Sequence, residues 1–416
     1  MDMEGFVTKQ LAESLSDQLI EWRRHLHAYP ELSFQEFETS KYLAAKLREI
    51  DGMKVETGIG KTGIVGTLSA GEGPCIAVRA DIDALPIAEE SELEYRSKNE
   101  GVMHACGHDA HPSIVLGVAH TVCELIKQKL ITKGTIKFIF QPAEESTDEQ
   151  GLSGAPYMIR DGALEGVDAA LALHMCPWLP VGSLQMNDGY SMANVDVFEA
   201  KLKGTGGHGA YPQLGTDPVW MLGPVLQAIY GIVARRVSPL DPTVLSIGQI
   251  HAGTASNIIP TEVTIEGTMR SYSSENRKFI AKELEKAISI VDVFEGSYDL
   301  TITKGEPSLM NDPIVNSWLE ESVRYLYPES TIVNEPFGLG GEDFGYMSQL
   351  VPSSMFFLGC ATSDGIQRDL HTPIFNLDER CLPIGVSILA ETVRRFVQEE
   401  VKPLTRKSNK GEGTNQ

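Results

Sequence analysis

In the first half of the chain, segments with helical periodicity alternate with short runs of apolar residues. Apolar side chains recur at the spacing of an amphipathic helix over residues 11–28 and 37–50, and the chain after Pro112 continues as a helix to about Lys129. Near-continuous apolar runs, which are typical of buried strands, occupy residues 63–68, 75–80, 135–140 and 169–173. Helices that alternate with such strands predict an α/β fold built on a mainly parallel sheet.

The pattern changes at about residue 190. Residues 195–202 alternate between apolar and polar, as in a strand with one exposed face, and Asp217-Pro218 supplies the cap and the first residue of a helix. Two strands, a helix and a last strand follow at residues 244–250, 263–269, 275–291 and 298–303. This order predicts a small α+β unit with a four-stranded antiparallel sheet.

The α/β pattern resumes at Asp312-Pro313, which opens another helix. We therefore predict one α/β domain, residues 1–189 and 306–404, interrupted by an insert at residues 190–305. The polar residues 405–416 are predicted to form a flexible tail. Functional residues of a parallel sheet lie just past the carboxyl ends of its strands, so polar groups at those positions are the first candidates for a site.

Composition and charge limit the classes of function. The chain has 416 residues, 42% hydrophobic and 22% charged, as expected for a globular protein with two domains. Its formal net charge of −22 disfavours partners such as nucleic acid or an anionic membrane, because both would be repelled. The sequence has no bilayer-spanning apolar run and no secretory-signal layout, so we expect a cytoplasmic protein. Most of the six scattered cysteines are expected to be buried thiols.

The stretch 103–112 concentrates side chains that bind divalent metals. It holds three histidines, an aspartate and Cys106, which is separated from His108 by a single glycine. Thiolate and imidazole are ligands of borderline-soft ions, and this spacing lets both face one ion. A lone Cys-x-His pair is weak evidence, so the other polar groups at strand ends decide the matter.

Several further groups lie at predicted strand ends, and each also has a simpler interpretation. Glu144-Glu145 follows the strand at 135–140 and could be a solvated loop, His174 and His371 could be ordinary core histidines, and Asp81 and Asp83 could cap a turn. Taken together, one sulfur, three imidazoles and several carboxylates at one sheet edge suit two metal ions that share a water molecule.

Motifs in a fixed order support this interpretation. They are Trp22–His27 with Pro30–Ser33, Arg79–Pro86, Met103–His111, Gln141–Glu145, His174, Gly206–Pro212, Gly340–Phe344 and Leu370–Pro373. In these motifs, which span nearly the whole chain, the protein resembles the aminoacylase/hippurate hydrolase family. That family includes the auxin-conjugate (indole-acetyl amino acid) hydrolases and belongs with the co-catalytic metallopeptidases.

The resemblance implies a set of roles in a zinc-peptidase-like catalytic domain. Glu144 resembles the general base and Asp83 the carboxylate behind a ligating histidine. Two divalent ions (Mn²⁺, Zn²⁺, Ni²⁺ or Co²⁺) are implied as cofactors. The residues that look like their ligands are Cys106, His108, Glu145, His174 and His371.

The resemblance also implies that the insert is a lid and dimerisation domain, so a homodimer or higher homo-oligomer is expected. His208 resembles the lid histidine that reaches the partner subunit's active site, and Asn257 and Arg270 resemble the groups that hold a substrate carboxylate. The chain departs from the family pattern in an extended loop at residues 146–152 and in Gln213, where a second histidine is common. Both departures concern the substrate pocket.

The sequence therefore predicts a metal-dependent amidohydrolase that cleaves the amide bond of N-acyl L-amino acids. Its substrates are expected to be small molecules, such as N-acetyl amino acids. A dipeptidase or aminopeptidase of the same clan is the nearest alternative. A cysteine hydrolase with Cys106 as nucleophile and a non-catalytic protein with one structural zinc are more remote alternatives.

Overall fold

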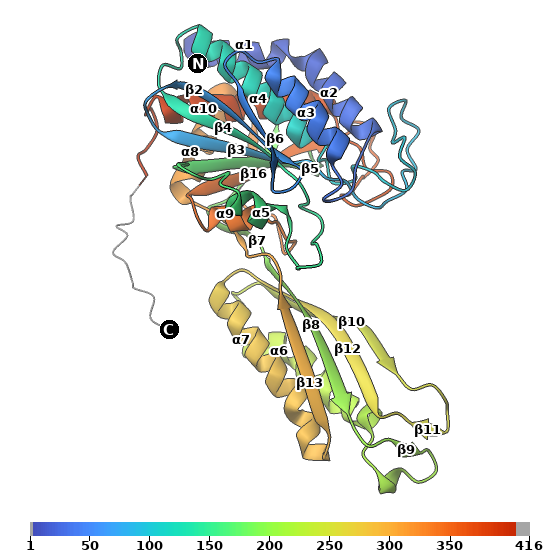
Figure 1. The fold of residues 1–416 in the computed structure, drawn as a ribbon. Coiled ribbons are helices and arrows are strands. Elements are labelled where there is room, and N and C mark those ends of the chain that lie inside the picture. The colour runs from blue at the N-terminus through green and yellow to red at the C-terminus, as the bar shows by residue number, and fades with distance from the viewer. Residues whose placement is uncertain (1–2, 405–416) are drawn as a thin grey trace.

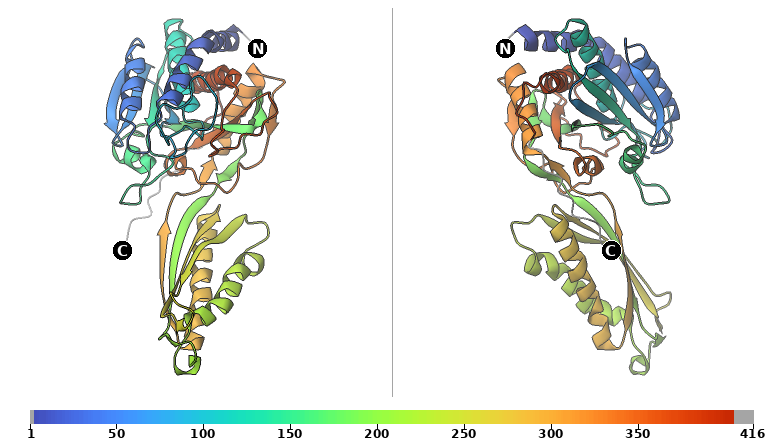
Figure 2. Two further views of the ribbon diagram at one scale, coloured as in Figure 1. Left: turned by 90° about the vertical axis from the view of Figure 1, so that its right-hand side faces the viewer. Right: turned by 60° about the vertical axis from the view of Figure 1, so that its left-hand side comes forward.

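The computed structural model describes residues 3–404, so the tail predicted for residues 405–416 lies outside the described residues. Figure 1 shows two parts: a larger α/β part, in which blue, teal and red segments meet, and an elongated part in green and yellow that extends away from it. Figure 2 shows the same separation from two other sides. The two ends of the described chain therefore build one part, and the residues between them build the other.

The larger part is organised around an eight-stranded sheet. In spatial order its strands are β1 (Lys54–Ile59), β2 (Gly63–Gly71), β4 (Gly134–Gln141), β3 (Cys75–Asp81), β5 (Ala169–Pro180), β16 (Ser353–Ala361), β6 (Ser183–Gln185) and β15 (Thr331–Val333). The four central strands, from β4 to β16, are parallel to one another. Antiparallel pairs occur only toward the sides, at β1–β2, β2–β4 and β16–β6. The prediction of an α/β fold with a mainly parallel sheet is confirmed.

Helices cover both faces of this sheet. The main core lies on the side of α1 (Met3–Ser14), α2 (Ser16–Ala28), α3 (Phe37–Arg48), α4 (Ala110–Lys127), α8 (Pro313–Leu326) and α10 (Leu382–Val397). The short helices α5 (Gly154–Arg160) and α9 (Phe344–Ser348) lie on the other face, which is turned toward the elongated part (Figure 1).

The helix predicted for residues 11–28 is divided between two helices in the structure. The periodicity over residues 11–28 predicts a continuous helix, but the chain breaks at Leu15 between α1 and α2. The hydroxyl of Ser14 donates to the carbonyl of Leu11 and that of Ser16 to the carbonyl of Glu13, so these side chains compete with helical backbone hydrogen bonds.

The elongated part has a four-stranded antiparallel sheet in the order β10 (Thr243–Ala252), β12 (Glu262–Ser271), β8 (Asn194–Lys203) and β13 (Ser297–Lys304), as predicted. Helices α6 (Pro218–Arg236) and α7 (Ser274–Ile288) pack on it and enclose a separate core. The Asp217 side chain accepts hydrogen bonds from the first backbone N–H groups of α6, which confirms the predicted cap. The domain boundaries given above stay a prediction.

Short elements complete the fold. Strands β7 (Gly189–Met192) and β14 (Leu309–Asn311) pair where the two parts join, and β9 (Gly207–His208) pairs with β11 (Ile258–Ile259) at the far tip of the elongated part (Figure 1). The 3-10 helices are Pro212–Leu214, Ser289–Phe294 and Glu379–Cys381. All six cysteines are buried and free, including Cys106, whereas burial was expected of most of them. Between residues 3 and 404, no helix is long and apolar enough to cross a membrane.

Candidate metal centre

The polar groups predicted at strand ends converge at one edge of the large sheet. Asp81 is the last residue of β3, Asp83 follows two residues later, and Glu144-Glu145 comes shortly after β4. His174 differs from the prediction, because it lies inside β5 rather than at its end. The strand continues to Pro180 because it stays paired with β16 beyond His174.

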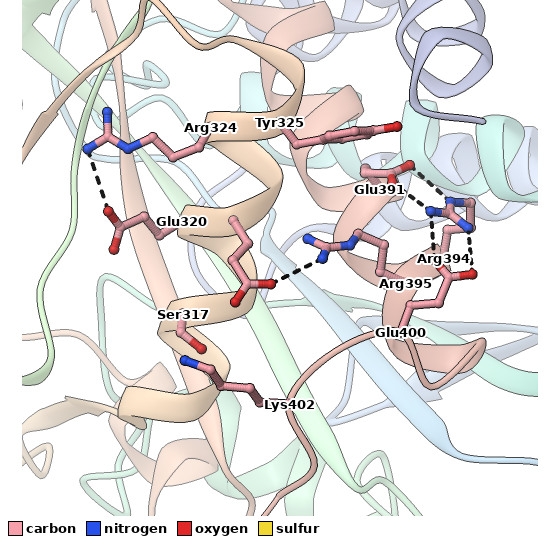
Figure 3. Close-up of a pocket in the computed structure, with 10 residues that line it drawn as sticks. Ser317, Glu320, Arg324, Tyr325, Glu391, Arg394, Arg395, Glu400 and Lys402 are labelled. Carbon is pink, nitrogen blue, oxygen red and sulfur yellow. Dashed lines mark hydrogen bonds and ion pairs between the residues drawn. The ribbon is translucent and has the colours of Figure 1, made fainter. Parts of the chain in front are cut away.

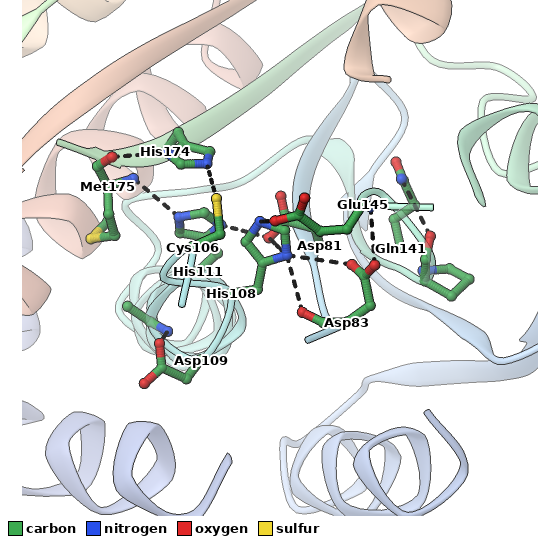
Figure 4. Close-up of polar contacts among 12 residues, drawn as sticks. Asp81, Asp83, Cys106, His108, Asp109, His111, Gln141, Glu145, His174 and Met175 are labelled. Atoms are coloured by element: carbon green, nitrogen blue, oxygen red, sulfur yellow. Dashed lines mark hydrogen bonds and ion pairs between the residues drawn. The ribbon is translucent and has the colours of Figure 1, made fainter. Parts of the chain in front are cut away.

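The five predicted metal ligands come together although they are far apart in the sequence. The Cys106 Sγ atom lies 3.4 Å from Nε2 of His174 and 3.3 Å from Nε2 of His371. The Glu145 Oε1 atom lies 3.2 Å from Nε2 of His371 and 3.8 Å from Nε2 of His108. Figure 4 shows how Cys106, His108, Glu145 and His174 face a common centre. We call these five residues the donor cluster.

The donor cluster fits divalent metal. Cys106–His108–His174, Cys106–Glu145–His371 and His108–Glu144–Glu145 each bring their donor atoms within 4.8 Å of one another. One of these atoms, Nε2 of His108, is buried and makes no hydrogen bond. A buried polar atom without a hydrogen bond is costly, and a bound cation would satisfy it. One thiol, three imidazoles and carboxylates suit zinc and its neighbours in the first transition row.

The electrostatics of the site also favour a cation. Burial lowers the pKa of His108, but Asp81 and the hydrogen-bonded Asp83 outweigh it and raise that pKa to about 10. Burial and the nearby carboxylates of Glu145 and Glu144 raise the pKa of the Cys106 thiol well above its usual range. Without a bound ion Cys106 is therefore a poor nucleophile, which weighs against a cysteine hydrolase.

Asp83 positions two members of the donor cluster. Its Oδ1 atom faces Nδ1 of His108 at 3.3 Å, while Oδ2 accepts hydrogen bonds from the backbone N–H of Glu145 and from the Ser33 hydroxyl, at 3.0 and 2.6 Å. His174 is oriented by its own strand, because its Nδ1 contacts the carbonyl of Met175 at 2.8 Å. Each histidine thus keeps Nε2 free for a metal.

His111 is a site residue whose role the sequence does not indicate. Its Nδ1 lies 2.5 Å from Asp81, and its Nε2 accepts a hydrogen bond from the backbone N–H of Met175 at 3.1 Å. Both ring nitrogens are used, so His111 ties β3 and α4 to β5 rather than binding an ion. Spacing alone could not separate it from His108, because both belong to the same histidine-rich stretch.

Glu144 lies beside the donor cluster in a group of buried acids. Burial, followed by the negative charges of Glu342 and Glu145, raises the pKa of Glu144 well above its usual range. Arg79 balances part of this charge through ion pairs with Asp81, Glu342 and Asp343, at 2.7, 3.1 and 2.8 Å. The Glu342-Asp343 pair was part of a motif but had no predicted role, and the structure places it behind Glu144.

Two residues of the site adopt an unusual backbone conformation. Ala143, which precedes Glu144, has a φ of 48°, and the donor His371 has a φ of 60°. Non-glycine residues rarely occupy this left-handed region, and such strain is typical of functional sites whose surroundings hold it in place.

The predicted substrate-binding residues are distributed differently. Arg270 lies where β12 meets the larger part, and its guanidinium group approaches Gly341. Its Nε donates to the Thr268 hydroxyl at 3.1 Å. His208 and Asn257 are exposed at the tip that carries β9 and β11, far from the donor cluster of the same chain (Figure 1).

A cleft of about 760 Å³ between α8 and α10 is separate from the donor cluster (Figure 3). Its charged side chains largely pair with one another: Arg394 contacts Glu391 at 2.8 Å and Glu400 at 2.9 Å, and Arg395 contacts Glu321 at 3.1 Å. The Arg395–Glu321 pair joins α10 to α8, whereas Arg394 pairs within α10 and with the residues just after it, so the cleft is explained as part of the helix packing.

A comparison with protein families matches residues 77–395 to "Peptidase family M20/M25/M40". The chain belongs to the M20 family. A thermostable carboxypeptidase of Saccharolobus solfataricus is 39% identical to this M20 hydrolase over 91% of the chain and 95% of the relative. An N-acetyl-L-cysteine deacetylase of Bacillus subtilis is 37% identical over 92% and 89%.

Solved structures agree with this assignment. A Bacillus subtilis protein described as a dinuclear metal-binding peptidase of the M20 family aligns with a TM-score of 0.79 and 32% identity, over 93% of this chain and 99% of that one. Family membership and the donor cluster together support bound divalent metal in this M20 hydrolase.

Proposed function

We propose that this M20 hydrolase cleaves the amide bond of N-acyl L-amino acids and releases a carboxylic acid and a free amino acid. The observation that carries the proposal is the position of Glu144, a carboxylate held against the five side chains of the donor cluster. The N-acetyl-L-cysteine deacetylase relative supports the choice of an N-acyl amino acid.

Cys106, His108, Glu145, His174 and His371 would hold two divalent ions. When bound, these ions would acidify a water molecule and polarise the acyl oxygen of the substrate. Asp83 keeps Nε2 of His108 directed at the centre and fixes the backbone of Glu145. Metal identity among Mn²⁺, Zn²⁺, Ni²⁺ and Co²⁺ is set by ligand chemistry and supply.

Glu144 is the proposed general base and acid. Its carboxylate takes the proton of the attacking water, and the same proton then passes to the departing amine. The place of Glu144 beside the donor cluster suits both steps, because a carboxylate there can reach a water molecule at the centre and the departing amine. Arg79 limits the repulsion among the surrounding acids by pairing with Glu342 and Asp343.

The elongated part would supply the groups that hold the substrate. The Arg270 guanidinium at the junction suits the α-carboxylate of the amino acid, because its fork of donors matches two carboxylate oxygens. His208 and Asn257 are too remote to serve their own donor cluster, so we propose that they serve the partner subunit of a homodimer, with His208 stabilising the oxyanion.

A peptidase is the second candidate. The carboxypeptidase relative favours it, and an α-carboxylate anchor at Arg270 would serve either substrate. N-acetyl-L-alanine and L-alanyl-L-alanine separate the two candidates, because the first has a blocked nitrogen and the second a free ammonium group. Preferential hydrolysis of the dipeptide would replace the proposed activity with peptidase activity.

The test of the catalytic role is the Glu144→Gln variant. We expect the metal content per chain, measured by elemental analysis, to be unchanged. We expect kcat to fall by roughly 10²–10⁴-fold, which is the rate enhancement that a general base usually contributes. Glu149→Gln, an exposed residue of the same loop, is the matched control and should keep its activity. A Glu144→Gln enzyme that retains most of its kcat would refute the assignment.

Chelation separates the metal mechanism from the cysteine alternative. A metal-stripped enzyme should lose activity and regain it with divalent ions alone. Activity that survives metal removal but is lost on thiol alkylation would instead identify Cys106 as the nucleophile.

A further inference from the structure

Aromatic rings continue outward from the donor cluster along one face of the large sheet. His174 and Trp178 both belong to β5, whose register with β16 shifts between Cys176 and Pro180. The ring of Phe337 connects them: its centroid lies 6.0 Å from that of His174 and 5.1 Å from that of Trp178, with planes inclined by 27° to the indole. We call Trp178, Phe337 and Phe357 the aromatic wall.

The inner end of the aromatic wall is rigid. Phe337 stacks on Phe357 with centroids 3.7 Å apart and planes inclined by 6°. Phe357 is fully buried in β16 and is the register partner of His174 in the neighbouring strand. The position of Phe337 is therefore fixed directly against a proposed metal ligand.

The backbone on both sides of Phe337 is also held. The N–H of Phe337 donates to the Ser191 hydroxyl at 3.4 Å, and the carbonyl of Pro336 accepts from the side-chain amide of Gln185 at 2.9 Å. On the other side of Phe337, the carbonyl of Gly338 accepts from the Tyr272 hydroxyl at 3.3 Å. The wall is thus built before any ligand arrives, which lowers the entropic cost of binding.

The outer end of the wall is open. Trp178 is 44% exposed although one side of its indole is covered by Phe337. An exposed tryptophan stacked on an ordered aromatic platform beside a proposed catalytic centre offers a flat apolar surface to a ring. The wall contains no charged side chain, so it offers a ligand ring stacking rather than an ion pair.

We propose that the aromatic wall makes this enzyme prefer substrates that carry an aromatic ring close to the scissile amide, with Trp178 as the specificity-determining residue. This inference rests on the proposed N-acyl amino acid hydrolysis. The ring can belong to either half of the substrate, an aroyl group on the acyl side or an aromatic amino acid on the other. The shared chemistry is stacking on the indole of Trp178.

The experiment compares N-benzoyl-L-alanine, N-acetyl-L-phenylalanine and N-acetyl-L-alanine. We expect Trp178→Ala to lose about tenfold or more in kcat/KM on one of the two aromatic substrates, about 1.4 kcal/mol, and less than about threefold on N-acetyl-L-alanine. The affected substrate identifies which half contacts the wall. Trp178→Phe, which keeps a ring, should restore most of the loss. Phe37→Ala is the matched control, because Phe37 is an exposed aromatic residue (60%) of the same part of the molecule that has no place in the site.

Failure of this inference and failure of the proposed function give different results. If Trp178→Ala changes all three substrates by the same factor, or none of them, the aromatic preference is refuted while amide hydrolysis stands. If the wild-type enzyme hydrolyses none of the three, the products benzoate and L-phenylalanine are titrated calorimetrically against the metal-loaded protein. Binding that is lost in Trp178→Ala then supports the wall without the proposed function, and equal binding by both proteins refutes the wall.

Discussion

The turn that carries Glu144 is held by a residue from a distant part of the sequence. The Glu36 carboxylate accepts hydrogen bonds from the backbone N–H of Ala143 at 2.9 Å and from the hydroxyl of Thr62 at 2.6 Å. Ala143 is the left-handed residue of the turn, so Glu36 stabilises a conformation that costs free energy by itself. Burial, and then the charge of Asp83, raise the pKa of Glu36 to about 7.

This shift predicts a pH dependence of stability. Because the folded pKa of Glu36 lies above the unfolded value near 4.5, the folded state binds the extra proton between these values. The contribution to the free energy of unfolding is complete below pH 4.5 and is lost as pH rises through 7, by at most about 3 kcal/mol.

Urea unfolding of the metal-stripped protein at pH 5 and pH 8 measures this effect. Glu36→Gln should make the difference between the two pH values smaller, since an amide does not titrate. Glu38→Gln, an exposed carboxylate nearby, is the control and should leave the difference unchanged. Equal pH dependence in the wild type and Glu36→Gln would show that Glu36 does not titrate in this range.

At the scale of elements, the sequence predicts those helices and strands whose hydrophobic periodicity or capping residues are clear. Strands β2 to β5, α6 with its Asp217 cap and the antiparallel sheet of the elongated part follow from these local signals. The central strand β16 is not among the predicted strands. The length of β5 does not follow from local signals, because residues after His174 continue as a strand only through pairing with β16. The edge strand β1 was also missed, since its residues are mostly exposed and show no apolar run.

Helix α4 shows how an element places the donor cluster. It begins directly after His108, and Asp109 caps it by accepting a hydrogen bond from the N–H of Ala110 at 3.0 Å. The other carboxylate oxygen of Asp109 contacts the buried Arg23 and His27, both at 2.7 Å. Arg23 and His27 belong to α2, so this ion-pair network fixes α2 against the start of α4 and thereby against the loop of Cys106 and His108.

Two adjacent arginines on α2 test this network. Arg23 is fully buried, whereas the side chain of Arg24 is 45% exposed, and both pair with Glu379. Arg23→Met should lower the free energy of unfolding by about 3–5 kcal/mol, because it leaves Asp109 buried and charged without its main partner. Arg24→Met, the matched control, should cost less than about 1 kcal/mol.

Chemical denaturation at neutral pH measures both variants. If Arg23→Met and Arg24→Met unfold at the same denaturant concentration, the buried pair does not organise α4. The loss in Arg23→Met should shrink as pH falls below 4. Burial raises the pKa of Asp109, but the charges of Arg23 and His27 outweigh it and hold that pKa below its usual range, so the stability tied to the ionised form is lost as pH falls.

At the scale of the whole molecule, the sequence predicts the composition of the site better than its geometry. The motifs name the donor cluster and Glu144, which come together at one sheet edge as expected of parallel strands. They do not indicate the distance of His208 and Asn257 from that edge, because the reach of an inserted domain depends on tertiary packing. The aromatic wall cannot be predicted from the sequence for the same reason, because Trp178 and Phe337 lie far apart in the chain and meet only in the folded structure.

The position of His208 leads to a test by complementation between subunits. If His208 acts on the partner subunit, His208→Ala chains have a complete donor cluster and Glu144→Gln chains supply an intact His208. A mixed dimer then contains one working site out of two, so the purified hybrid of two inactive variants should have about half of the wild-type activity per dimer. The variants are co-expressed with different affinity tags, and the doubly purified hybrid is assayed with N-acetyl-L-alanine. Because a His208 that served its own chain would leave both sites of the hybrid defective, an inactive hybrid of confirmed composition would rule out action between subunits.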